Sequence, residues 1–211
     1  MSHDLHQFGP SLPDGTLLEG IVTTLDADGS PHIAPMGPIV DADFHWLLLR
    51  PFCTSNTFAN LKRSRQGVLH VTDDVELIAR AAIGRLDRKP PLVALPGGGC
   101  YLADACRWYA FAVESLDDSA ERTDIACRVV EQGELRPFFG FNRAKHAVIE
   151  AAILATRIGI VSENDIRAEL RRLAPLVEKT GSRAEHRAFE LLADYVDDAL
   201  AASSRPAGAD A

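Results

Sequence analysis

Residues 18–37 read LEGIVTTLDADGSPHIAPMG, and this stretch decides the fold class of the chain. Residues 18–25 are rich in β-branched side chains, which favour a strand. The following DADGS, at 26–30, has the Asp-Gly chemistry of a hairpin turn. It also resembles the start of a calcium-binding loop, but the Glu that completes such a loop is missing. We therefore predict a β-hairpin with its turn at residues 26–30.

The return strand of this hairpin contains two prolines, Pro31 and Pro35. Because proline lacks a backbone N–H, both cannot lie in a central strand of a sheet. We therefore expect this strand at a sheet edge, where irregular backbone is free to face a ligand. A third strand is expected at residues 44–50, FHWLLLR, which is apolar enough to be buried on both faces.

Periodicity divides the rest of the chain into two halves. The first half has further strand-like runs at 67–72, 101–114 and 123–132, and helical patterns at 58–64 and 75–83. The second half reads as three helices, for which Asn142, Ser162 and Ser182 are the expected N-caps. Pro175 is expected to kink or end the middle one of the three.

The composition of the chain excludes several classes of function. The 211-residue chain has a formal net charge of −8, which argues against a nucleic-acid partner, since phosphate neutralisation needs clustered cations. The four cysteines form no C-x-x-C pair, so we interpret them as reduced, mostly buried thiols and expect no metal site. There is no signal-peptide pattern and no run near the roughly 18 apolar residues of a membrane span. We expect a cytoplasmic protein with no membrane partner.

Hydroxyl and amide side chains crowd the start of the helix expected at 58–64. Ser55-Asn56-Thr57 precedes it, and the free N–H groups and positive dipole end of a helix N-terminus suit a phosphate. Arg50, just upstream, would add positive charge. The alternative is that Ser55 or Thr57 only caps the helix. Local sequence leaves both interpretations open.

The helix expected after Asn142 carries Arg143, Lys145 and His146 in its first turn, where cations oppose the helix dipole. A bound anion would compensate them, as would acidic groups from elsewhere in the fold, and a solvated basic turn is the third possibility. The chain has no nucleophile elbow, P-loop or dinucleotide-binding motif. The sequence thus offers few candidates for a catalytic acid or base. That suits a protein whose reactive atoms belong to a cofactor.

Several of these runs together resemble the domain-of-unknown-function family 447 (DUF447). The resemblance is carried, in order, by EGIVTT at 19–24, HIAPMG at 32–37, RPF at 50–52, SNT at 55–57, NL at 60–61, VTDD at 71–74 and NRAKH at 142–146. That family is grouped with the FMN-binding split barrels, relatives of flavin reductases and pyridoxamine-phosphate oxidases.

The resemblance implies a β-rich α+β fold in two parts. A six-stranded antiparallel split β-barrel that binds FMN would span residues 17–136, and a C-terminal helical bundle packed on the barrel would span 137–202. Residues 1–16 would be a flexible N-terminus, and residues 203–211 are expected to be a disordered tail.

Carried over position by position, the resemblance also implies a binding site. Contacts to the flavin ring, mainly from backbone, would come from His32, Ile33, Ala34, Pro35, Met36 and Gly37. The ribityl phosphate would be held by Arg50, Thr54, Ser55 and Thr57, with Asn60 bracing their loop. Arg143, Lys145 and His146 would contribute to the pocket for the anion or substrate. His32 or His146 would serve as a proton donor.

The implied function is a flavin-dependent oxidoreductase acting on a small molecule. The resemblance further implies a homodimer with FMN at its interface, and a link to tetrahydromethanopterin-dependent one-carbon metabolism. The alternative is a non-catalytic flavin-binding or pathway-accessory protein, which the lack of a clear acid–base set favours.

Overall fold

The computed structural model describes residues 15–203, which form two compact units. The β unit comprises the chain up to Thr72 together with Lys89–Phe138, and the helical unit comprises Asp73–Arg88 together with the chain from Phe139 onward. Residues 73–88, expected within the barrel domain, therefore belong to the helical unit. Residues 1–14 and 204–211, which hold nearly all of the expected flexible N-terminus and disordered tail, lie outside the described residues.

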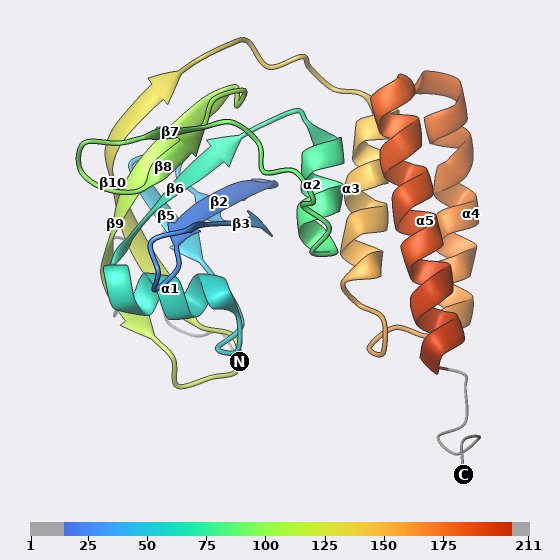
Figure 1. Ribbon diagram of the computed structural model, residues 1–211, viewed down its shortest axis with the longest axis horizontal. Helices are drawn as coiled ribbons and strands as arrows, with labels where there is room; N and C mark the ends of the chain where they lie inside the picture. Colours follow the sequence, from blue (N-terminus) through green and yellow to red (C-terminus); the bar gives the residue numbers. More distant parts are fainter. Residues whose placement is uncertain (1–14, 204–211) are drawn as a thin grey trace. The chain divides into compact units, whose positions relative to one another are not determined.

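The β unit is built on one curled antiparallel sheet (Figure 1). Its strand order is β1-β4-β5-β10-β9-β6-β2-β3, and a separate two-stranded sheet pairs β7 with β8. The strands of the main sheet are β1 (Thr16–Leu17), β2 (Gly20–Leu25), β3 (Pro31–Met36), β4 (Ile39–Val40), β5 (Trp46–Leu49), β6 (Gln66–Val71), β9 (Arg107–Asp117) and β10 (Asp124–Glu134). The small sheet consists of β7 (Leu92–Ala94) and β8 (Cys100–Leu102).

The main sheet thus has eight strands in the described part of the chain, where six were expected. The two additional strands are β1 and β4, which have two residues each and pair with one another. Pro38 directly precedes β4 and cannot donate to a ladder, which helps to explain why this strand is so short. The six longer strands correspond to the predicted barrel strands.

The predicted hairpin is formed by β2 and β3, in register from Gly20↔Met36 to Leu25↔Pro31. Asp26 N donates to the Ser30 carbonyl at 2.8 Å, and Gly29 takes the left-handed conformation with φ 82°. This confirms the turn. The strand β3 ends the strand order of the sheet, so the edge position predicted from its prolines is confirmed as well.

The core of the β unit lies inside the curl of the sheet. Helix α1 (Asn56–Ser64) contributes Phe58 and Leu61 to it, and Phe111 of β9 is among its largest buried side chains. All four cysteines belong to this unit and are free thiols; Cys53 is half-buried and the other three are buried. Burial raises the pKa of the Cys127 thiol far above its usual range, which makes this thiol unreactive.

His70 of β6 is fully buried and neutral in the folded protein. Its Nδ1 donates to the Ile21 carbonyl at 3.0 Å, and its Nε2 accepts from the Leu102 N–H at 3.1 Å. Burial lowers its pKa from the ordinary 6.5 to about 4, although the bond to Ile21 opposes that shift. Both ring nitrogens are engaged, so His70 is a structural residue of the core.

Acid is expected to destabilise the β unit through His70. The unfolded chain binds a proton on this residue below pH 6.5, whereas the folded chain does so only below about pH 4. The contribution of neutral His70 is therefore complete above pH 6.5 and falls by about 1.4 kcal/mol per pH unit between these values. Urea unfolding followed by tryptophan fluorescence measures this, because Trp46 and Trp108 both lie in the β unit. The His70→Gln variant should be less stable at pH 7 but lose its deficit as pH falls; a constant deficit would contradict the assignment.

The helical unit consists of α2 (Val75–Ala82), α3 (Arg143–Ala155), α4 (Glu163–Thr180) and α5 (Arg183–Ser203). The predicted N-caps of α3 and α4, Asn142 and Ser162, are confirmed. Pro175 lies inside α4 and does not end it, because Leu173 and Val177 on either side are buried in the core of the unit. None of the helices in residues 15–203 is long and apolar enough to cross a membrane.

Candidate functional site

The loop between β5 and α1 is held in place by the residues that lead into β10. Thr123 donates to the Pro51 carbonyl through both its N–H, at 3.0 Å, and its hydroxyl, at 2.9 Å. Cys53 N donates to the Glu121 carbonyl at 3.0 Å, and Phe52 forms an antiparallel bridge with Arg122. The loop that precedes α1 is therefore an extension of the sheet.

Ser55 is the N-cap of α1. Its Oγ accepts from Phe58 N at 3.2 Å and donates to the Phe52 carbonyl at 2.8 Å, so its one hydroxyl proton is already engaged. For Ser55 the capping interpretation is thus confirmed. A contribution of Ser55 to phosphate binding would come through the backbone geometry that it fixes.

Thr57 differs from Ser55. The residue is only 2% exposed, and its hydroxyl has no hydrogen-bond partner within residues 15–203, so the hydroxyl oxygen is among the few atoms of Thr57 that reach the surface. The first turn of α1 contains no acidic residue, and the amides of Asn56 and Thr57 are at positions that have no acceptor inside a helix. A free hydroxyl, free amides and the positive dipole end meet here without a carboxylate, which is the chemistry that receives a phosphate. We call these groups of Asn56 and Thr57 the α1 seat.

Asn60 fastens α1 to the hairpin of β2 and β3. Its Nδ2 donates to Thr24 Oγ1 at 3.0 Å and to Asp26 Oδ1 at 2.8 Å, and its Oδ1 accepts from Arg63 at 3.0 Å. Thr24 lies opposite His32 in the register of the hairpin. The side chain of Asn60 therefore connects the helix that carries the α1 seat with β2 and the hairpin turn, and β2 is paired with the strand expected to contact the flavin ring.

Arg50 is oriented by a carboxylate. Its Nε donates to Asp124 Oδ1 at 2.7 Å, and its side chain is about half exposed. This pairing through Nε leaves the terminal guanidinium nitrogens available for a second acceptor. Thr54, in the same loop, is exposed.

The edge of β3 that does not pair with β2 carries free backbone N–H and C=O groups. The nitrogens of Pro31 and Pro35 cannot donate to β2, so these prolines occupy the non-hydrogen-bonded pairs of the ladder, and Ile33 shares their parity. The free edge therefore carries the carbonyls of all three residues and the N–H of Ile33. The side chain of Ile33 is buried, whereas His32, Ala34, Pro35, Met36 and Gly37 are half-buried.

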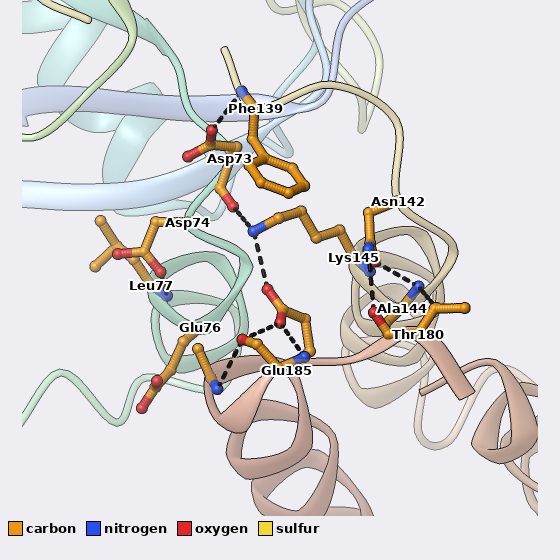
Figure 2. Close-up of polar contacts among 12 residues, drawn as sticks. Asp73, Asp74, Glu76, Leu77, Phe139, Asn142, Ala144, Lys145, Thr180 and Glu185 are labelled. Carbon is orange, nitrogen blue, oxygen red and sulfur yellow. Dashed lines mark hydrogen bonds and ion pairs between the residues drawn. The ribbon is translucent and has the colours of Figure 1, made fainter. Parts of the chain in front are cut away.

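Lys145 of the helical unit is held by acceptors of the protein itself (Figure 2). Its Nζ donates to the Asp73 carbonyl at 2.6 Å and to Glu185 Oε1 at 2.9 Å. Asp73 also accepts from Phe139 N at 2.8 Å through its carboxylate. Of the compensations considered from the sequence, acidic groups from elsewhere in the fold are therefore what the structure provides for Lys145. We call Asp73, Lys145 and Glu185 the clasp.

Glu185 is nearly as buried as a core residue. Burial alone would raise its pKa, but hydrogen bonds from the Ser182 hydroxyl, from Lys145 and from Ser182 N outweigh it and bring the pKa to about 2. The carboxylate is consequently charged at neutral pH and pairs with the ammonium. This arrangement joins the start of α5, where Glu185 accepts from both the N–H and the hydroxyl of Ser182, to α3.

The other two predicted residues of α3 remain at the surface. The Asn142 side chain accepts from Ala144 N at 2.9 Å and from Lys145 N at 3.1 Å, so these two amides of the first turn are already satisfied. Arg143 is exposed, and His146 is 64% exposed with its Nε2 4.0 Å from Glu150. The start of α3 therefore offers fewer free backbone donors than the α1 seat, because the Asn142 side chain occupies two of them. In the described part of the chain no group of His, Cys, Asp and Glu is arranged to hold a metal ion.

Sequence reasoning missed the acidic and basic partners that lie far away in the chain. Arg122 precedes β10 and Asp124 begins it, and both lie more than 60 residues after the loop that they contact. No local pattern marks them, because only the pairing of the sheet brings them to that loop. Glu185 likewise reaches Lys145 only through the packing of α3 and α5.

Comparisons with known proteins agree with this architecture. Two models of a family described as a protein of unknown function (DUF447) match the chain, its N-terminal domain at residues 18–136 and its C-terminal domain at 142–194. An FMN-bound protein from Methanosarcina mazei, also assigned to DUF447, superposes with a TM-score of 0.74 and 23% identity, covering 91% of this chain and all of that one. The styrene monooxygenase flavin reductase from Pseudomonas putida S12 superposes with a TM-score of 0.50 and 14% identity, covering 57% of this chain and 82% of that one. No curated protein matches.

Proposed function

The chain belongs to the DUF447 family of proteins of unknown function, and from this premise we propose that it binds FMN and acts as a flavin-dependent oxidoreductase. The substrate would be a small molecule. The observation that carries the proposal is the α1 seat, where the buried Thr57 offers an unpartnered hydroxyl beside free helix amides. The FMN in the M. mazei relative and the flavin reductase activity in the name of the P. putida protein support the same cofactor.

The residues of the β unit suit both ends of FMN. The α1 seat and the free guanidinium nitrogens of Arg50 would hold the phosphate, while Asn60 keeps α1 in place. The free edge of β3, with its carbonyls and the Ile33 N–H, would contact the polar edge of the flavin ring. When bound, FMN supplies hydride transfer, and the protein binds, orients and shields it.

The site has few candidates for a proton donor. His32 is half-buried on β3 and is the better candidate for a proton donor, because it belongs to the strand expected to contact the flavin ring. His146 is exposed and lies in the helical unit. This scarcity of acid–base groups favours the second candidate function, a flavin-binding accessory protein without catalysis of its own.

The proposal includes two wider expectations. One is a homodimer with FMN at its interface, as the family resemblance implies; sedimentation velocity of the FMN-loaded protein tests it. The other is a link to tetrahydromethanopterin-dependent one-carbon metabolism, which predicts that a pterin is the preferred electron acceptor or donor.

Reoxidation kinetics distinguish the enzyme from the accessory protein. The FMN-loaded protein is reduced anaerobically, mixed with dioxygen, a nicotinamide or a pterin, and followed through the visible absorbance of the flavin. An oxidoreductase should pass electrons to at least one acceptor faster than free reduced FMN does. Rates no faster than those of free FMN for every acceptor would favour the accessory function.

A further inference from the structure

The cations around the loop that precedes α1 are mostly paired. Arg50 donates to Asp124, Lys62 Nζ lies 2.6 Å from Asp118, and Arg63 donates to Asn60. Arg122 is the exception. It is exposed and has no carboxylate or carbonyl partner within residues 15–203, and its guanidinium lies over the ring of Phe52 with 4.7 Å to the ring centroid.

The backbone of Arg122 is connected to the helix that carries the α1 seat by two short steps. Arg122 bridges Phe52 in the sheet, and the Phe52 carbonyl accepts from both the N–H and the hydroxyl of Ser55, the N-cap of α1. The carbonyl of the neighbouring Glu121 accepts from Cys53 N of the same loop. The buried hydroxyl of Thr123 is likewise turned toward Pro51.

The negative charge of a phosphate requires a cation that is not already paired with a carboxylate. A phosphomonoester carries about −1.5 to −2 at neutral pH, whereas a helix N-terminus supplies roughly +0.5. Arg50 adds one positive charge, but Asp124 already compensates it. Without another cation the phosphate would remain largely unneutralised. The face-on contact with Phe52 costs Arg122 none of its hydrogen-bond donors and restricts the conformations of its side chain.

We infer that Arg122 contacts the phosphate of the flavin and supplies the unpaired positive charge by which this site, together with the α1 seat, distinguishes FMN from riboflavin. The inference rests on the proposed function and adds a residue outside the sequence runs that carry the resemblance to DUF447. Phe52 acts as the platform that positions it. Arg50, by contrast, is a cation whose charge is shared with Asp124.

Parallel titrations with FMN and with riboflavin test this role. Arg122→Gln should raise the dissociation constant for FMN about tenfold or more, as expected for a charge-assisted hydrogen bond, and leave that for riboflavin unchanged. Arg122→Lys should retain part of the preference for FMN. Arg128→Gln is the matched control, because Arg128 is also an exposed arginine of this region but pairs with Glu114 at 2.7 Å. It should alter neither constant.

Three outcomes would overturn the inference, and they differ from one another. Unchanged FMN affinity in Arg122→Gln would show that the guanidinium does not touch the phosphate. Equal losses for FMN and riboflavin would show a structural role instead. A wild-type protein that binds neither flavin would overturn the proposed function itself, and this assignment with it.

Discussion

Replacing Thr57 with Val is expected to raise the dissociation constant for FMN about ten- to hundredfold. The change keeps the shape of a side chain that is 2% exposed and removes only its unpartnered hydroxyl. A hydrogen bond to a charged group contributes about 1.5–3 kcal/mol, which corresponds to this range. Fluorescence titration with FMN measures the loss, and the affinity for riboflavin should stay the same.

Ser55→Ala is the matched control for this experiment. It removes the cap of α1, so it should lower stability by about 1 kcal/mol and affect FMN binding less than Thr57→Val does. Combining both substitutions should give the weakest binding. If the double variant binds FMN as tightly as the wild type, the phosphate is not at the α1 seat.

Replacing Lys145 with Met is expected to lower the free energy of unfolding of the helical unit by about 3–5 kcal/mol. The substitution removes the ammonium from a buried ion pair and leaves the charge of Glu185, which is 5% exposed, without its cation. It also removes the donor to the Asp73 carbonyl. Chemical unfolding followed by far-ultraviolet circular dichroism reports this loss, because α2 to α5 hold most of the helical residues.

A double-mutant cycle assigns the effect to the clasp. Glu185→Gln keeps an acceptor for Ser182 N, and the variant with both substitutions should be less destabilised than the sum of the two single variants. Tryptophan fluorescence provides an internal reference, since Trp46 and Trp108 lie in the β unit. Additive effects of the two substitutions would show that Lys145 and Glu185 do not stabilise each other.

The local part of the fold could be predicted from the sequence because its causes are local. The Asp-Gly turn of the hairpin, the edge position of β3 and the caps Asn142 and Ser162 each depend on residues within a few positions of one another. Of the two effects expected of Pro175, a kink or the end of the helix, the second is wrong, since α4 continues to Thr180 with buried residues on both sides of the proline.

The partners of the site could not be predicted, since sheet register and helix packing decide them. Ser55 and Thr57 look interchangeable in the sequence, yet the fold engages one hydroxyl as a cap and leaves the other free. From the sequence, Lys145 is a candidate ligand for an anion. In the structure the packing of α5 places Glu185 beside it, and the two form an ion pair. The role that we infer for Arg122 depends on a bridge to Phe52 across 70 residues of chain.

The visible absorption spectrum of the purified protein, followed by acid release and identification of its chromophore, tests the central claim most directly. We predict a flavin spectrum and release of FMN, either as purified or after incubation with FMN and removal of the excess. A colourless protein that takes up no FMN would contradict the proposed function, while the curled antiparallel sheet would stand.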